Sequence, residues 1–231
     1  MGSSRLPGKS LLLLAGKPVL TRIIERLSSI PGVPVLVATS VAKADDVLAD
    51  LCLQNKVPFV RGDEEDVLSR FLLAAESYNL DVLVRITGDS PLIDGFIVAR
   101  MIEEFHKGDL DYYSNLRPRT LPRGFGCEIF RRALLDAAAK DKRPEDRGEH
   151  VVVPYVDRHL AELKVGNFRI EEDFSGMRLT LDEKADYELI RRIYDALYAV
   201  NKTFSYRDVV RFLEKNPELK KINAGVQSRN P

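Results

Sequence analysis

Gly2-Ser3-Ser4-Arg5-Leu6-Pro7-Gly8-Lys9 is the stretch around which the rest of this chain is organised. Its small residues allow the backbone to approach another group closely and to present N–H donors to it. Arg5 and Lys9 add positive charge to the same loop, one as a planar guanidinium and the other as a mobile ammonium. Backbone donors beside two such cations are typical of a site that grips a polyphosphate. The common phosphate loop has a different spacing between its glycines.

Two other interpretations of this segment stay open at this point. Basic loops that contain Gly and Pro often serve only as surface connectors. Residues 1–4, Met-Gly-Ser-Ser, also match a leader that cloning vectors add to many proteins. The sequence that follows has to decide between these interpretations and a phosphate-binding role.

The composition indicates one large α/β domain, spanning residues 1–231, with a polar tail at 216–231. Acidic and basic residues balance at 35 each, so no net field attracts nucleic acid or an anionic membrane. No apolar run reaches the length of a membrane span and no secretory signal is visible, which predicts a cytoplasmic protein. Two distant cysteines and three histidines without metal-ligand spacing argue against zinc chemistry.

Short apolar runs alternate with amphipathic stretches of about a dozen residues along the chain. The strands expected from this pattern are 35–38, 57–60, 81–87, 112–114, 127–130, 163–168 and 178–181. The expected helices are 18–29, 45–54, 67–78, 96–106, 133–139, 149–159, 184–199 and 206–215. Such alternation predicts βαβ units with right-handed crossovers and a mostly parallel sheet.

The position of the basic loop is unusual for such a fold. In a doubly wound sheet a phosphate-binding loop normally follows the carboxyl end of a central strand. Only Met1 precedes the loop in this sequence. We therefore expect either a sheet that lacks its first strand or a start that lies farther upstream.

Two carboxylates follow expected strands and are candidates for metal binding. Asp89, in Gly88-Asp89-Ser90-Pro91, comes after the strand at 81–87, and Asp182 comes after the strand at 178–181. Strand-end carboxylates can converge on one Mg²⁺, which takes few protein oxygens and completes its shell with phosphates. Turn formation is the usual explanation of a lone Gly-Asp pair, and Asp182 would also serve as the N-cap of the next helix, a role that is compatible with metal binding.

Several short motifs occur together in one order. They are Gly-Ser-Ser-Arg-Leu-Pro-Gly-Lys, Ala-Gly-Lys-Pro, Val-Ala-Thr-Ser, Arg-Ile-Thr-Gly-Asp-Ser-Pro-Leu-Ile-Asp, Tyr-Ser-Asn, Glu-His-Val and Leu-Thr-Leu-Asp-x-x-x-Asp. On these motifs the chain resembles the cytidylyltransferase family of the spore-coat polysaccharide SpsF type. It is more distantly similar to the acylneuraminate and 3-deoxy-manno-octulosonate cytidylyltransferases. The resemblance extends from Met1 to Ile222-Asn223-Ala224.

The resemblance implies a three-layer α/β/α fold like that of the nucleotide-diphospho-sugar transferases, here lacking its first strand. It implies an enzyme that joins CTP to a sugar acid or similar acceptor and releases pyrophosphate, with Mg²⁺ as cofactor. The nucleotide-binding residues implied are Gly2, Ser3, Ser4, Arg5, Lys9, Arg85 and Thr87. Arg5, Lys9 and Asp89 would be catalytic, and Asp89 and Asp182 would hold the metal. Asn115 and Glu128 would line the acceptor side, and His150 is a candidate base beside them.

The sequence departs from the family pattern at two places. Relatives usually open with an apolar strand that ends in Gln-Ala-Arg, and they often carry Asp-Val where this chain has Gly126-Cys127. A different acceptor, or a non-catalytic nucleotide-binding subunit, would fit these departures. A glycosyltransferase is a further alternative because Asp109-Leu110-Asp111 matches the Asp-x-Asp metal motif of that class. Homodimers are common among the relatives.

Overall fold

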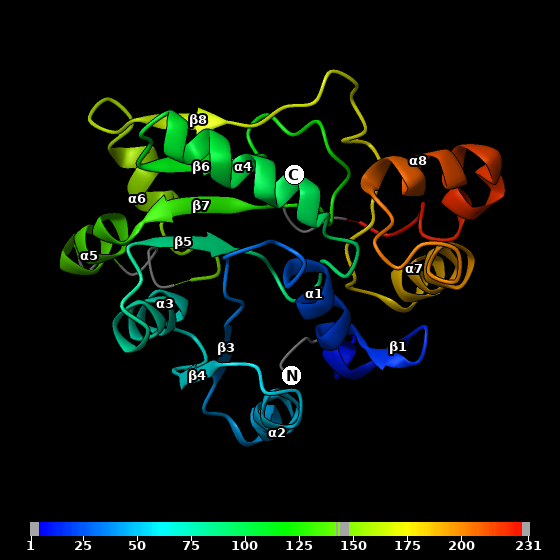
Figure 1. Ribbon diagram of the computed structural model, residues 1–231, viewed down its shortest axis with the longest axis horizontal. Coiled ribbons are helices and arrows are strands. Elements are labelled where there is room, and N and C mark those ends of the chain that lie inside the picture. Colours follow the sequence, from blue (N-terminus) through cyan, green and yellow to red (C-terminus); the bar gives the residue numbers. More distant parts are fainter. Residues whose placement is uncertain (1–4, 142, 144–147, 228–231) are drawn as a thin grey trace.

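The computed structural model describes residues 5–141, 143 and 148–227, and its strands and helices alternate along the chain (Figure 1). The strands are β1 Leu13–Leu14, β2 Lys17–Pro18, β3 Val37–Ser40, β4 Phe59–Gly62, β5 Val82–Arg85, β6 Tyr112–Ser114, β7 Glu128–Arg131 and β8 Val165–Asn167. The α-helices are α1 Val19–Leu27, α2 Asp46–Gln54, α3 Val67–Ser77, α4 Gly95–Lys107, α5 Arg132–Asp141, α6 Val153–Arg158, α7 Lys184–Leu197 and α8 Tyr206–Lys215. The predicted α/β class is confirmed.

The larger sheet has four strands in the order β5-β7-β6-β8. Strand β7 runs antiparallel to both of its neighbours, whereas β6 and β8 are parallel. Because β7 lies between β5 and β6 and opposes both, those two strands point the same way. The expectation of a mostly parallel sheet therefore holds, with β7 as the exception.

A second pair of strands, β3 and β4, forms a separate parallel sheet. It lies beside β5 rather than beside β8, and in Figure 1 it is seen below the larger sheet with α2 and α3. Among the described residues no strand joins the two sheets. The β1–β2 hairpin is a third, small unit that contacts α1 and α7.

Helices cover both faces of the larger sheet. Neighbouring strand residues point to opposite faces, and the core follows that alternation. Tyr113 and Ile129 belong to a core built with α1, α4, α7 and α8, whereas Tyr112 and Phe130 belong to a second core built with α3, α5 and α6. The chain therefore has the three-layer arrangement that the sequence predicts. Within the described ranges, every helix is too short or too polar to span a bilayer.

Two predicted elements differ from the structure. The segment 178–181 is extended but forms only an isolated bridge, between Arg123 and Arg178. It lies between two loops. The Leu179 amide donates to the Arg123 carbonyl, and the Leu181 amide donates to the Asp89 carbonyl. The helix predicted at 149–159 begins only at Val153, because Val151 has a positive φ of 49°.

The close contact of these loops depends on Gly124. Its φ is +102°, and a Cβ at this position would lie 2.3 Å from the Leu179 carbonyl oxygen. Only glycine combines that backbone conformation with so close an approach. Gly124 thereby sets the position of the segment that ends at Asp182.

Candidate nucleotide-binding site

Lys9 is the centre of a cluster of charged side chains. Gly8, with φ 73°, turns the chain into the short 3₁₀-helix η1 Lys9–Leu11. The turn directs the Lys9 ammonium to the Leu181 carbonyl oxygen at 2.8 Å and to Asp182 Oδ1 at 3.0 Å. Asp89 Oδ2 lies 3.7 Å from the same nitrogen. The structure thus brings together three predicted site residues from distant parts of the sequence.

Asp89 is held in place from both its side chain and its backbone. The Thr87 hydroxyl donates to Asp89 Oδ1 at 2.5 Å, and the Leu181 amide donates to the Asp89 carbonyl at 2.8 Å. Thr87 is therefore a positioning neighbour of Asp89 in this structure. The backbone bond ties the loop after β5 to the segment that carries Asp182.

Asp182 does not cap helix α7, which corrects one of the two expectations for this residue. The N-cap is Glu183, which forms a reciprocal capping box with Asp186. The carboxylate of Asp182 is consequently available to three cations, with Arg178 at 2.9 Å, Lys9 at 3.0 Å and Arg5 at 3.2 Å. Partial burial acts to raise the pKa of Asp182, but Lys9, Arg178 and Arg5 outweigh burial and hold this pKa below its usual value.

Arg178 and the start of the tail complete this cluster, and the sequence analysis missed both. Arg178 donates to Asp182 and to the fully buried Asp186, and Asn223 donates to Asp186 Oδ1 and to the Arg178 carbonyl. The tail is therefore packed at least as far as Asn223, which is 5% exposed. The polar tail predicted at 216–231 thus supplies the buried Asn223 amide that donates to Asp186.

Arg5 completes the positive side of the cluster. Its guanidinium contacts Asp182 Oδ2 at 3.2 Å and Glu183 Oε1 at 3.3 Å. Gly2, Ser3 and Ser4, which the resemblance implies as nucleotide contacts, lie outside the described residues. The described part of the loop therefore offers one guanidinium and one ammonium, each paired with carboxylates.

The donor set of this cluster fits a hard divalent cation. Within the described part of the chain, no three His, Cys, Asp or Glu side chains form a ready-made metal site. Asp89 and Asp182 nevertheless reach the same ammonium nitrogen of Lys9. Mg²⁺ typically uses one or two carboxylates and takes its other ligands from water and phosphates. Asp89 and Asp182 are therefore the residues that would hold it.

A second cluster joins Arg85 at the end of β5 to Glu128 at the start of β7, two residues that face each other in the sheet register. Arg85 Nη1 is ion-paired with Glu128, whose other oxygen accepts from the Tyr112 hydroxyl at 2.7 Å. Burial and the Glu128 carboxylate raise the pKa of Tyr112, so the phenol stays protonated and remains a donor. Arg85 also donates to the Glu149 carbonyl at 2.6 Å.

The remaining acceptor-side predictions fall near this cluster or in a loop. His150 follows Glu149 and is exposed, and the ring that stacks on Tyr155 belongs to His159, with centroids 4.1 Å apart. Asn115 is buried, and its side chain bridges backbone groups, donating to the Phe125 carbonyl at 2.7 Å and accepting from the Cys127 amide at 2.9 Å. The contacts of Asn115 therefore shape the 115–127 loop.

The Asp-x-Asp segment lies at the other end of the sheet strands, before β6. Asp109 is exposed and pairs with Arg131 at 2.5 Å and Lys164 at 2.8 Å. Asp111 Oδ2 accepts from the Lys164 amide. Both carboxylates serve the local turn, which weakens the glycosyltransferase alternative.

Comparisons with known proteins show which family the chain belongs to. A protein-family model described as Cytidylyltransferase matches residues 1–216. The chain belongs to this family. The chain is 30% identical over 94% of its length to the spore coat polysaccharide biosynthesis protein SpsF of Bacillus subtilis, covering 92% of that protein.

Two solved structures resemble this chain. A cytidylyltransferase from Leptospira borgpetersenii superposes with a TM-score of 0.89 at 34% identity, covering 100% of this chain and 95% of the other. CMP:2-keto-3-deoxy-manno-octonic acid synthetase, solved with CTP, superposes with a TM-score of 0.63 at 19% identity over 84% of this chain and 94% of the other. The second likeness shows a shared fold.

The Arg85–Glu128 pair predicts a measurable effect on stability. Glu128→Gln leaves an acceptor for Tyr112 but removes the anion beside Arg85. We expect the free energy of unfolding to fall by about 1–3 kcal/mol in urea titrations, the cost of an unsatisfied buried polar group. Glu103→Gln, which breaks an exposed ion pair with Lys107, should leave the free energy of unfolding nearly unchanged. An unchanged stability for Glu128→Gln would show that the pair has no structural role.

Proposed function

We propose that the protein is a Mg²⁺-dependent cytidylyltransferase that transfers CMP from CTP to a sugar acid or similar acceptor in the synthesis of a cell-surface or spore-coat polysaccharide. The observation that carries the proposal is the position of Lys9 between Asp89 and Asp182, with Arg5 on the same carboxylate. Two cations and two metal-binding carboxylates at one point are what a triphosphate and its Mg²⁺ require.

The paired charges suggest how the site would receive its substrate. Lys9 and Arg5 bind carboxylates in this structure, so their charge is already neutralised. Asp89 and Asp182 would hold a divalent cation, and the Lys9 ammonium and the Arg5 guanidinium would bind the phosphates. When bound, Mg²⁺ would neutralise phosphate charge and help to orient the triphosphate.

The chemistry follows from this arrangement. An acceptor oxygen attacks the α-phosphorus, the new P–O bond forms, and the bond to the departing pyrophosphate breaks. Lys9 and Arg5 stabilise the negative charge that develops on the phosphate oxygens, and no covalent enzyme intermediate is required. The names of the relatives support the acceptor class, because one acts in spore coat polysaccharide biosynthesis and another makes the CMP derivative of a sugar acid.

A non-catalytic nucleotide-binding subunit is the second candidate. Within the described residues the β3–β4 sheet is separate from β5, and this interruption of the sheet beside the site favours it. Such a subunit would bind a nucleotide but would not release pyrophosphate.

Nucleotide-induced stabilisation tests the proposal without knowledge of the acceptor. With Mg²⁺ present, CTP at 100 times its Kd should stabilise the chain by about 2.7 kcal/mol, and UTP and ATP at the same concentration should stabilise it less. Thermal unfolding followed by calorimetry measures the difference. Equal stabilisation by the three nucleotides, or none, would contradict the proposal. Pyrophosphate release with a panel of sugar acids then separates an enzyme from a binding subunit.

A further inference from the structure

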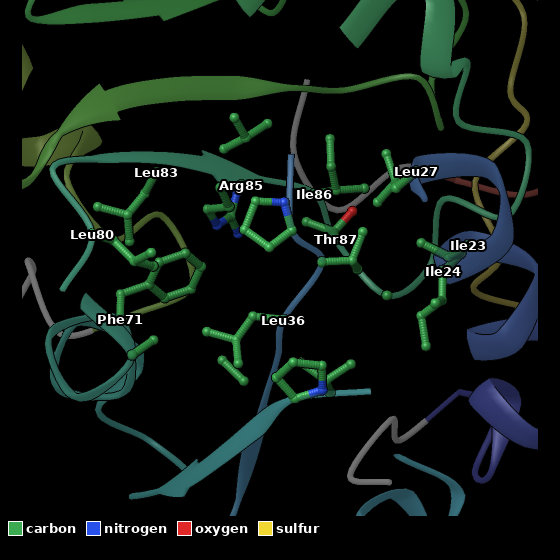
Figure 2. A pocket seen from close by; sticks show the side chains of 18 of the residues that line it. Ile23, Ile24, Leu27, Leu36, Phe71, Leu80, Leu83, Arg85, Ile86 and Thr87 are labelled. Atoms are coloured by element: carbon green, nitrogen blue, oxygen red, sulfur yellow. The ribbon is translucent and has the colours of Figure 1, made fainter. Parts of the chain in front are cut away.

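The two carboxylates of the candidate site are held by different kinds of structure. Asp89 follows β5, which is hydrogen bonded to β7, and Figure 2 shows Arg85 and Thr87 where that strand ends, along the cavity that they line. Asp182 instead follows the segment 178–181, which forms only an isolated bridge and bonds to loops. Segments with few fixed backbone bonds open locally at low cost. The direction of the Asp182 carboxylate therefore depends on the side chains around it.

The fully buried carboxylate of Asp186 connects helix α7 to Asp182. Asp186 Oδ2 accepts from the backbone amide of Asp182 at 3.1 Å and from that of Glu183 at 3.0 Å. The same oxygen accepts from Arg178 Nη2 at 2.9 Å, and this nitrogen also donates to Asp182 Oδ2 at 2.9 Å. Asp186 therefore fixes the backbone of Asp182 directly and its carboxylate through Arg178.

The pairing of Arg178 with Asp186 determines how Arg178 acts on Asp182. A largely buried guanidinium needs a counter-charge, and Asp186 supplies it by accepting from Nε and from Nη2, each at 2.9 Å. Because its charge is balanced there, Arg178 acts on Asp182 chiefly as an oriented donor. It engages Oδ2 of Asp182, whereas Oδ1 faces the Lys9 ammonium, which lies 3.7 Å from Asp89. The arrangement leaves Oδ1 on the side of Asp89.

Asn223 joins this cluster from the tail. Its Nδ2 donates to Asp186 Oδ1 at 2.9 Å and to the Arg178 carbonyl oxygen at 2.9 Å, so both protons of the amide are used. The first bond holds α7 and the second holds the start of the extended segment. Asn223 is itself anchored, because it is buried and the nearby Leu219 and Ile222 pack against the larger core. The tail thus ties together the two elements between which Asp182 lies.

We propose that Asn223 is a positioning residue for the divalent cation. By holding Asp186 and Arg178 together, it directs the Asp182 carboxylate and sets the affinity of the site for Mg²⁺. The inference rests on the proposed function for the identity of the metal ligands. It goes beyond the family assignment, because the family model matches residues 1–216 and Asn223 lies outside them.

The contacts of Asn223 determine which substitutions are informative. Both groups that it contacts are acceptors, a carboxylate and a carbonyl, so position 223 requires a donor. Alanine removes both donors and part of the side chain. Aspartate keeps the shape of asparagine, but it removes both donors and brings a second carboxylate to the buried Asp186. The two substitutions therefore separate the loss of hydrogen bonds from the loss of packing.

Calorimetric titration with Mg²⁺, first alone and then at saturating CTP, tests the inference on the 231-residue chain and three variants. Asn223→Ala should raise the Kd of Mg²⁺ by about 10- to 100-fold, as expected when a metal ligand loses its orienting partner, and Asn223→Asp should raise it at least as much. Ser205→Ala is the matched control, because it removes the hydroxyl that caps α8 and should lower Tm by roughly 2–4 °C, as Asn223→Ala should. The control should bind Mg²⁺ like the parent chain.

The Kd of CTP in EDTA is the second readout. It should be the same in Asn223→Ala and in the parent chain, because no metal is then held by Asp182. Weaker CTP binding in EDTA would indicate a general loss of structure and would overturn the positioning role.

The remaining outcomes separate this inference from the proposed function. Equal Mg²⁺ affinities in Asn223→Ala and the parent chain would overturn the inference and leave the proposed function intact. A loss in Asn223→Ala but not in Asn223→Asp would also overturn it, because packing rather than hydrogen bonding would then be the cause. A parent chain that binds Mg²⁺ in neither titration would contradict the metal site of the proposed function, and the role of Asn223 would fall with it.

Discussion

Lys9→Ala should weaken the binding of Mg²⁺-CTP by about 10- to 100-fold, the range expected when a hydrogen bond from a charged donor is lost. The Lys9 side chain is 17% exposed and is directed at the edge of the sheet where Asp89 and Asp182 meet. On the proposed function, an ammonium held there would be the main source of attraction for the triphosphate in the described part of the loop, with Arg5 as the second. Isothermal titration with CTP measures the change in Kd.

The fold should survive this substitution, which keeps the result interpretable. Without Lys9, Asp182 retains Arg178 at 2.9 Å and Arg5 at 3.2 Å, and Asp89, whose side chain is 21% exposed, retains its hydrogen bond from Thr87. Lys107→Ala is the matched control, because it removes an exposed lysine of α4 that pairs with Glu103. CTP affinity should be unchanged in this control. Equal affinities in Lys9→Ala and the parent chain would contradict the assignment of Lys9 to the triphosphate.

The order and type of the elements could be predicted because apolar residues recur at helical or strand spacing along most of the chain. Helix α8, Tyr206–Lys215, matches its predicted range, and strand β6, Tyr112–Ser114, does so as well. The segment 178–181 was wrongly predicted as a strand for a physical reason. Whether an extended segment forms a ladder depends on its neighbours, and here they are two loops rather than strands.

The sequence predicted that Asp89 and Asp182 converge because the carboxyl ends of parallel strands meet at one edge of a sheet. Of the two, only Asp89 follows a sheet strand, β5, and Asp182 is brought to it by the bond from the Leu181 amide to the Asp89 carbonyl. The supporting residues could not be found in the same way. Arg178 is four residues from Asp182, and side chains at that spacing are neighbours on a helix. The segment between them is extended, so the spacing did not predict their ion pair. Asn115 spans backbone groups at positions 125 and 127, a contact that only the folded loop creates.

The N-cap of α7 is Glu183, one position later than the sequence predicted. Aspartate is the commoner N-cap residue, which made Asp182 the natural prediction. The reciprocal bonds of Glu183 with Asp186 put the helix start one residue later. That shift leaves the Asp182 carboxylate directed toward Lys9, and it strengthens the interpretation of Asp182 as a metal ligand.

Asp89→Asn should remove the dependence of CTP binding on Mg²⁺, and we expect a loss of about 100-fold in affinity when Mg²⁺ is present. The substitution conserves shape, and the amide oxygen can still accept from the Thr87 hydroxyl. What is lost is one of the two negative charges available to the cation. In EDTA the effect of Asp89→Asn on CTP affinity should reverse. Without the metal, Asp89 repels the phosphates, so the chain with Asp89→Asn should bind CTP at least as well as the parent chain.

Asp109→Asn is the matched control for this change. Asp109 is exposed, lies before β6, and has a positive φ of 46° that asparagine also tolerates. Its ion pairs with Arg131 and Lys164 are on the surface, so their loss should leave CTP affinity and its Mg²⁺ dependence unchanged. If Asp109→Asn instead abolished the Mg²⁺ effect while Asp89→Asn preserved it, the metal would belong to the Asp-x-Asp segment. The glycosyltransferase alternative would then replace the cytidylyltransferase site argued from Lys9, Asp89 and Asp182.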